Sequence, residues 1–210
     1  MASNRRGTLA QFGVAIRGMV ALTILLGVIY PLVMTGAAQA IFPANANGSV
    51  VQVDGKDVAS DLVGQAYTRD TGAKDDEGNP VMEADPLWFQ TRPSAVEYDA
   101  MGSAASQYGP NNADLLAAIE ERRKTVATLE GVDPSQVPAD ALTASGSGLD
   151  PHISPAYAAL QVNRVARERR LAVATVQELV KENTKGRALG FLGEPTVNVV
   201  TLNRDLAELS

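Results

Sequence analysis

The longest apolar segment of the chain begins near the N-terminus and runs from about Val14 to Phe42. No charged residue lies between Arg17 and Asp54, which leaves 36 consecutive uncharged positions. Nine Val, Leu and Ile side chains in the middle of this run favour insertion into a bilayer by about 3 to 5 kcal/mol. A helix of this length crosses a hydrocarbon layer of about 30 Å. The pattern therefore predicts one transmembrane helix over residues 14–42.

The positive charges set the expected orientation of this helix. Arg5, Arg6 and Arg17 all precede or open the apolar run, so residues 1–13 are expected in the cytoplasm and residues 43–210 outside it. The alternative is a cleavable signal peptide, because Ala38-Gln39-Ala40 has the small-residue pattern of a cleavage site. The run is longer than the 7 to 15 residues or so of an ordinary signal core, which favours a retained anchor. Both interpretations export the remainder of the chain.

The exported part shows short elements of two kinds. Two β-rich segments, 49–53 and 56–58, flank Asp54-Gly55 and predict a hairpin. The polar segment from Asp70 to Asp85 predicts a surface loop. Near the end, Thr196 to Leu202 is rich in β-branched residues and predicts a buried strand.

Three helices are expected between these strands. One begins at Asn112 or Asp114 and ends near Leu129, and a second begins at Ser154-Pro155 and runs through Ala166 or further. A third has the capping-box pattern Thr175 to Glu178, with Gly186 beyond its end. The expected fold class is α+β: a single N-terminal transmembrane helix followed by a small mixed α+β extracytoplasmic domain.

Composition narrows the possible chemistry. The 210-residue chain has a formal net charge of −6, which argues against a nucleic-acid partner, and it has no cysteine. Thiol catalysis, disulfides and Cys-based zinc sites are therefore excluded. The single histidine makes a His-rich metal site or a catalytic triad improbable, and no segment assembles a nucleophile, a base and an orienting group.

The histidine lies in the segment GSGLDPHISPAYA, which begins at Gly146. Its glycines can cradle a phosphate, but the helix start lies several residues on and no Gly-Lys-Ser or Gly-Lys-Thr sequence follows. Asp150-Pro151 and Ser154-Pro155 favour turns, so a stiff corner that presents a helix is the preferred interpretation. His152 is expected to bond a nearby carbonyl or carboxylate.

Two further segments suggest contacts. The densest aromatic patch includes Trp88 and Phe89 beside Arg92, which is expected to stack on a ring or pair with a carboxylate. Residues 98–110 are small and rich in Gly and Ser, which suits a contact surface. A basic cluster late in the second helix is expected to form a solvated face: Asn163, Arg164, Arg167, Arg169 and Arg170. The candidates for contact with a partner are Trp88, Phe89, Arg92, Pro93, Ser94, Tyr98, Tyr108 and His152.

Five motifs occur in order along the chain: RPSA from Arg92, the Gly/Ser stretch ending YGPNN at Asn112, SGSGLDPHISPAYA from Ser145, QVNRVARER from Gln161 and GFLGEPTVNVVTLN from Gly190. With one N-terminal span, this order resembles the C subunit of the bacterial Kdp-type potassium-transporting P-type ATPase. The resemblance covers the span and most of residues 43–205. Two departures are a polar insertion over residues 70–85 and Gln107-Tyr108 in place of Asn-Leu.

The resemblance implies a non-catalytic subunit in the inner membrane that assembles or stabilises a complex against its potassium-binding subunit. The implied partners are that channel-like subunit, a P-type ATPase catalytic subunit and a small one-helix subunit, and the complex uses ATP and potassium ion. It also implies a proposed nucleotide contact at Ser147, Gly148 and Leu149, which the exported topology disfavours because ATP is scarce outside the cell. The alternative from another class is a secreted or periplasmic enzyme or ligand-binding protein that uses the 145–154 loop.

Overall fold

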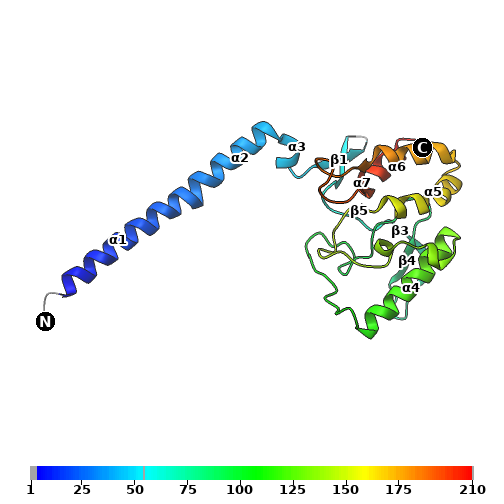
Figure 1. Cartoon of the computed structure of the whole chain (residues 1–210), viewed down its shortest axis with the longest axis horizontal. Helices are drawn as coiled ribbons and strands as arrows, with labels where there is room; N and C mark the ends of the chain where they lie inside the picture. The colour runs from blue at the N-terminus through cyan, green and yellow to red at the C-terminus, as the bar shows by residue number, and fades with distance from the viewer. Residues whose placement is uncertain (1–3, 54, 210) are drawn as a thin grey trace. The chain divides into compact units, whose positions relative to one another are not determined.

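A computed structural model describes residues 4–53 and 55–209 of the chain. It divides into two units, Met1–Ser49 and Val50–Ser210 (Figure 1). The first unit is helical, with α1 (Asn4–Ile24), a π-helical turn η1 (Leu25–Ile29), α2 (Tyr30–Ile41) and the short α3 (Pro43–Ala46). The second unit holds all the strands and the remaining helices among the described residues. This arrangement confirms the predicted α+β class with one long apolar helix at the N-terminus.

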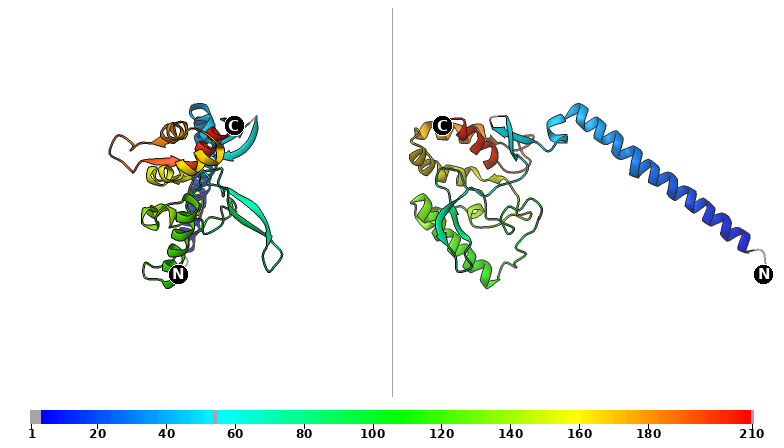
Figure 2. Two further views of the ribbon diagram at one scale, coloured as in Figure 1. Left: turned by 90° about the vertical axis from the view of Figure 1, so that its right-hand side faces the viewer. Right: turned by 180° about the vertical axis from the view of Figure 1, so that it is seen from behind.

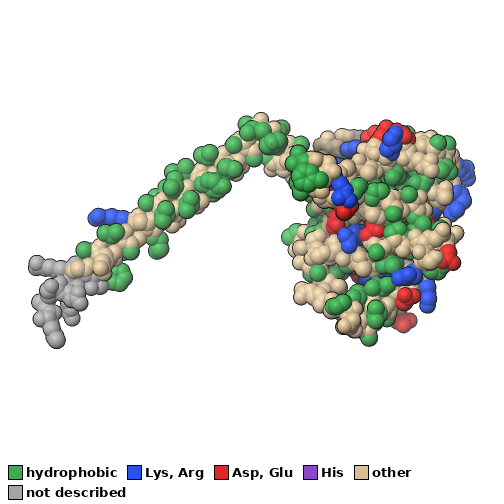
Figure 3. All heavy atoms as spheres, in the orientation of Figure 1, with side chains coloured by type: hydrophobic (Ala, Val, Ile, Leu, Met, Phe, Trp, Pro, Cys, Tyr) green, Lys and Arg blue, Asp and Glu red, His purple; other side chains and the backbone are tan. Residues whose placement is uncertain are grey.

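The apolar side chains of the N-terminal helix have no partners within their unit. Residues Ala10–Ile41 are long and apolar enough to cross a membrane, and none of their most apolar window is buried (Figure 3). The π-helical turn immediately precedes Pro31, and the Tyr30 amide donates to the Leu25 carbonyl, one residue further back than in an α-helix. Proline has no N–H, so a wider turn here accommodates its ring without ending the helix.

The first strands of the second unit form the expected hairpin. β1 (Val50–Val53) pairs antiparallel with β2 (Lys56–Ser60), and a register shift lies between Val51 and Gln52. The turn residue Asp54 lies outside the described residues. So do residues 1–3 of the expected cytoplasmic N-terminus.

The prediction of a surface loop over residues 70–85 is wrong. β3 (Thr68–Lys74) and β4 (Pro80–Ala84) form a second antiparallel hairpin, in which Arg69 pairs with Glu83 at 2.6 Å. The Asp75 side chain closes its turn by accepting hydrogen bonds from the amides of Glu77 and Asn79. Every residue of β3 is exposed, so neither face carries the apolar alternation by which a strand is recognised.

The C-terminal prediction is only partly right. Thr196–Asn198 is strand β7, the centre of a three-stranded antiparallel sheet with β5 (His152–Ile153) and β6 (Thr184–Lys185). The chain then turns into helix α7 (Val199–Ala207), because the Asn198 side chain accepts hydrogen bonds from the amides of Val200 and Thr201. Val199, Leu202 and Leu206 are fully buried at helical spacing, and this burial overrides the strand preference of the β-branched residues.

Two of the three predicted helix starts are correct. α4 (Ala113–Glu130) begins at an Asn112 cap, and α5 (Pro155–Arg169) begins at a Ser154 cap. Between them lie two short 3₁₀ turns, η2 (Pro134–Gln136) and η3 (Ala139–Ala141). The predicted capping box at Thr175 is wrong: α6 (Val173–Glu182) begins after Ala172, whose side chain cannot cap, and Val176, Leu179 and Val180 anchor the helix in the core.

Helix α5 lies at the centre of this core. Its buried face packs against α4, α6 and β7, and the fully buried Phe89 joins the same cluster. The buried apolar residues of α5 are Tyr157, Ala158, Val162, Val165 and Ala166. The segment between β4 and α4, residues 85–112, contains no helix or strand, and it carries most of the predicted contact residues.

Candidate partner-contact site

The first part of this irregular segment, residues 85–90, is fixed by side chains rather than by a neighbouring strand. Gln161 of α5 exchanges two hydrogen bonds with the backbone of Gln90, at 2.6 and 3.1 Å. Asn203 of α7 does the same for Phe89, at 3.0 and 2.9 Å. Both amides are buried, so they satisfy backbone groups that would otherwise be unpaired in the core.

Arg164 completes this support, and the prediction that it belongs to a solvated face is wrong. Its side chain is fully buried and donates to the carbonyls of Pro86 and Trp88 at 2.6 and 3.0 Å. Its Nε contacts both carboxylate oxygens of Glu130, at the end of α4, at 3.0 and 3.1 Å. Burial raises the pKa of Glu130, and the Arg164 charge opposes that shift. The pair fixes α4, α5 and residues 86–88 to one another.

Trp88 is held from two sides at the surface of this region. The Arg169 guanidinium lies 4.1 Å from the centre of its ring, and Tyr67 lies 6.1 Å away by ring centres. Arg169 therefore makes the cation–aromatic contact that Arg92 was considered for. Phe89, the next residue, has no exposed surface and belongs to the core, so only Trp88 of these two aromatic side chains reaches the surface.

Arg92 takes the other predicted role, since it pairs with Asp150 at 3.4 Å and also donates to the Thr143 carbonyl. The turn after it is unusual: Glu97 and Tyr98 both have positive φ angles, 52° and 60°. Ser94 stabilises this turn by accepting hydrogen bonds from the amides of Val96 and Tyr98, and the Tyr98 hydroxyl donates to the Arg92 carbonyl at 2.6 Å. Two successive non-glycine residues in this region cost free energy that the surrounding bonds must supply.

The glycine-containing loop at 145–149, expected to form a stiff corner and considered as a nucleotide contact through the family resemblance, supports this turn. Ser94 donates to the Gly148 carbonyl at 2.7 Å, and the Ala104 amide donates to the Ser147 carbonyl at 3.1 Å. A side chain on Gly148, whose φ is +69°, would lie 2.7 Å from Val96 and 2.8 Å from the Ala104 carbonyl. The glycine is required because the segment carrying the contact candidates passes directly over it.

Two amide groups of this loop, those of Gly148 and Leu149, are already used. The Gly148 amide donates to the Ser145 hydroxyl at 2.9 Å, and the Leu149 amide donates to the Ser147 hydroxyl at 3.1 Å. The start of α5 is occupied as well, because Asp140 accepts from the amide and hydroxyl of Ser154 at 2.7 and 2.9 Å. Phosphate binding at a helix start needs free N–H groups, so this geometry gives the nucleotide prediction no support.

His152 makes the structural contact expected of it. Its Nδ1 lies 3.1 Å from Asp150, which also accepts the His152 amide at 3.0 Å. Burial raises the pKa of Asp150, but these hydrogen bonds and the charges of His152 and Arg92 outweigh it, so the pKa lies below its usual range. A cavity of about 640 Å³ beside the loop is lined in part by the side chains of Arg92 and His152, and both of them contact Asp150.

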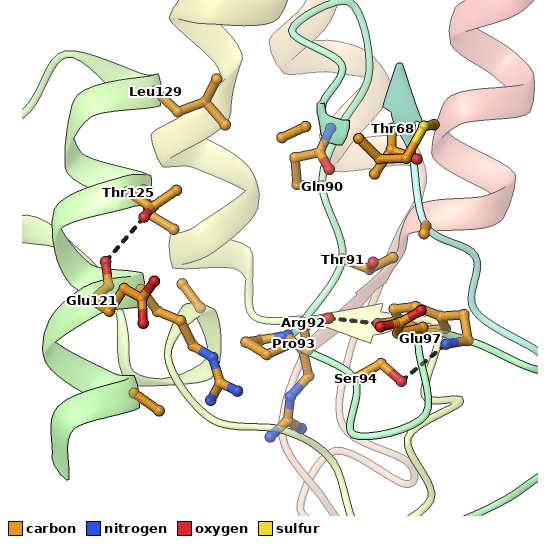
Figure 4. A pocket seen from close by; sticks show the side chains of 18 of the residues that line it. Thr68, Gln90, Thr91, Arg92, Pro93, Ser94, Glu97, Glu121, Thr125 and Leu129 are labelled. Atoms are coloured by element: carbon orange, nitrogen blue, oxygen red, sulfur yellow. Dashed lines mark hydrogen bonds between the residues drawn. The ribbon is translucent and has the colours of Figure 1, made fainter. Parts of the chain in front are cut away.

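A larger groove of about 990 Å³ lies between the β3–β4 hairpin, α4 and residues 90–98. Figure 4 shows Glu121, Thr125 and Leu129 of α4 on one side and Gln90 to Ser94 on the other. The groove has a mixed polar and apolar lining. Among the residues that the structure describes, no group of three or more His, Cys, Asp or Glu is placed to hold a metal ion.

One further contact candidate, Tyr108, lies in the largely exposed stretch of residues 99–110, which also contains Met101. Tyr108 is 47% exposed and Met101 is 95% exposed, which is unusual for a large apolar side chain. The structure thus brings four of the candidates, Arg92, Pro93, Ser94 and Tyr98, together with the loop from Ser147 to His152. Trp88 lies elsewhere, beside Arg169 of α5 and Ala207 of α7. Tyr108 is not part of the groove lining.

Sequence reasoning missed the residues that hold this region in place: Glu130, Asp140, Gln161, Arg164 and Asn203. Gln161, Arg164 and Asn203 belong to the quoted motifs, and the polar Gln161 and Asn203 occupy positions on the apolar faces of their helices. A polar residue at a buried helical position was the signal that could have identified them.

Comparison with known proteins shows which family this chain belongs to. Residues 12–208 match the family model KdpC, described as the c chain of K⁺-transporting ATPase. A protein of Streptomyces avermitilis named potassium-transporting ATPase KdpC subunit is 46% identical over 207 residues, which covers 92% of this chain and 91% of that protein.

Two other relatives carry the same name. The protein of Kineococcus radiotolerans is 50% identical over 180 residues, covering 85% of this chain and 83% of the relative. The protein of Caldanaerobacter subterraneus is 46% identical over 186 residues, covering 88% of each. The family match over residues 12–208 includes both the apolar helix and the domain that follows it.

Proposed function

The chain belongs to the KdpC family, the c chain of K⁺-transporting ATPases, and on that premise we propose that its exported domain stabilises the pump by contact with the potassium-binding subunit. The chain is a non-catalytic subunit: the ATP hydrolysis and the potassium transport belong to the complex. Its partners are then the channel-like potassium-binding subunit, the P-type catalytic subunit and a small one-helix subunit.

The observation that carries this proposal is the way residues 92–104 are held. They form no helix or strand, yet the 145–149 loop fixes their backbone through Ser94, Ala104 and the close packing of Gly148. An irregular segment that is both exposed and rigid loses little conformational freedom when it binds, which favours a protein contact. The extended surface from Arg92 to Tyr108 is therefore the part of the domain best suited to a neighbouring subunit.

Site-specific photocrosslinking tests the contact. A photoreactive amino acid at Met101 or Tyr108 is expected to give a product with the potassium-binding subunit in the assembled complex. The matched control is Lys181, whose side chain is 75% exposed and lies on α6 with an ion pair to Glu178. Equal yields from Lys181 and Met101, or no product from Met101 in an intact complex, would rule out this surface.

The membrane arrangement is tested separately. An uncleaved anchor predicts that the intact mass of the mature chain includes Met1 to Ala40, whereas signal-peptide cleavage removes that segment. Because the chain has no cysteine, Ser103→Cys creates a unique exposed thiol. We expect a membrane-impermeant maleimide to label it from outside the cell. Labelling only after the inner membrane is opened would reverse the proposed orientation.

A further inference from the structure

The hairpin of residues 186–194, called here the Phe191 hairpin, projects from the body of the domain (Figure 2, left, orange). Ala188 and Leu192 exchange two backbone hydrogen bonds of 2.9 Å each and close its tip. Leu189, Phe191 and Leu192 are 84%, 68% and 51% exposed there. No other part of the described domain presents three large apolar side chains within four residues at such exposure.

The backbone conformation at the tip of the hairpin does not favour the leucine found at position 189, so the stability of the fold does not account for this residue. Leu189 and Gly190 have φ angles of 53° and 82°, the combination of a turn that favours Asn-Gly. A leucine is costly at positive φ, and its side chain gains nothing from the domain because it points into solvent. Asparagine would suit both the turn and the water. An apolar contact outside the domain accounts for the leucine.

The position of the hairpin in a membrane-anchored chain suggests what that contact is. Only eight residues separate Ile41, the end of the membrane-span candidate, from Val50, where the domain begins. Even fully extended they reach about 30 Å, so the domain stays next to the bilayer. Lys185 and Arg187 are exposed at the base of the hairpin, behind the apolar tip, and Arg187 pairs there with Glu194 at 2.6 Å. Apolar residues followed by cations match the order of acyl chains and phosphates in a lipid interface.

We propose that the Phe191 hairpin inserts its tip into the headgroup region of the bilayer that holds the N-terminal helix. The tip is convex and protruding, which fits a fluid interface. The net charge is no obstacle, because the contact depends on burial of the apolar tip, and at the base of the hairpin Glu194 is paired with Arg187 while Lys185 adds a further positive charge. This second attachment would limit rotation of the domain about its single helix. The inference depends on membrane anchorage and is independent of the subunit contact proposed above.

The test uses the full chain in phosphatidylcholine vesicles, with an environment-sensitive NBD label on the introduced cysteine of Phe191→Cys. The label is expected to emit at shorter wavelength, and nitroxide lipids with headgroup-level spin labels are expected to quench it about twofold or more. The control is Met101→Cys, which is fully exposed elsewhere on the domain and should not be quenched. Flotation of both labelled chains with the vesicles checks the anchorage itself.

A second variant separates lipid contact from folding. Leu189→Asn in the labelled chain relieves the turn, so the domain should be at least as stable, yet the quenching at position 191 should fall by half or more. The proposal is overturned if the label at 191 behaves like the label at 101 in vesicles. It is also overturned if the label becomes shielded only in the assembled complex, because the tip then contacts a protein subunit.

Discussion

Replacing Arg164 by methionine is the sharpest test of how residues 85–90, the first part of the irregular segment, are held. Methionine keeps the apolar stem but removes the guanidinium, which leaves the Glu130 carboxylate fully buried without its ion-pair partner. Breaking a buried pair in this way costs about 3 to 5 kcal/mol. The Pro86 carbonyl also loses its donor, and a buried unpaired group costs about 1 to 3 kcal/mol, whereas the Trp88 carbonyl keeps a hydrogen bond from the Gln90 side chain at 3.2 Å. Because these terms overlap, we expect a loss of about 4 kcal/mol or more in the free energy of unfolding.

The loss should depend on pH. Burial already raises the pKa of Glu130, and the Arg164 charge opposes this shift, so its removal raises the pKa further. A carboxyl group whose pKa is higher in the folded state stabilises folding at low pH and loses that contribution as the pH rises. The destabilisation by Arg164→Met is therefore expected to be larger at pH 8 than at pH 5.

Urea unfolding of the full chain in detergent micelles measures this effect. Trp88 is the only tryptophan and lies beside the altered carbonyl, so its fluorescence reports the transition directly. The control is Arg167→Met on the same helix, whose side chain is 65% exposed and should change the stability by less than about 0.5 kcal/mol. The double variant Glu130→Gln with Arg164→Met should recover about 2 kcal/mol. A loss below about 1 kcal/mol, or no recovery in the double variant, would refute the reasoning.

Three further predictions concern the 145–152 loop. Gly148→Ala should lower the unfolding free energy by about 2 kcal/mol in the same urea assay, because Gly148 has a positive φ and its new Cβ would lie too close to the Ala104 carbonyl. Gly146→Ala is the control and should be nearly neutral, because a Cβ at that position would have no atom within 4 Å. Asp150→Asn should destabilise the domain at neutral pH, since the pKa of Asp150 is lowered on folding; the difference from wild type should begin to shrink near pH 4 and vanish only as the pH falls below the lowered folded-state pKa, and a constant difference across a pH series of melts would contradict this. His152→Asn should retain most potassium uptake in a transport assay, because its contact with Asp150 is structural; a complete loss with the complex intact would assign the histidine a larger role.

The sequence alone determined the features that depend on local or one-dimensional patterns. The uncharged run that begins at Gly18 predicts an apolar helix longer than the core of a small water-soluble domain would bury. The caps at Asn112 and Ser154 were visible because a capping side chain acts on amides only two or three residues away. The contact of His152 with Asp150 was accessible for the same reason, since both residues lie in one turn.

The tertiary structure decided everything that depends on residues distant in the chain. The exposed β3–β4 hairpin is held by pairing between its two strands, and its sequence shows no alternation of apolar and polar residues that would predict it. Most of the strand expected over residues 196–202 is instead helix α7, because burial of Leu202 and Leu206 outweighs β-propensity. The pairing of Arg164 with Glu130, 34 positions away, places an expected surface charge in the core, where it holds residues 86–88. Local preferences are worth tenths of a kcal/mol each, whereas burying a charge or a large apolar side chain is worth several, so long-range burial decides where they disagree.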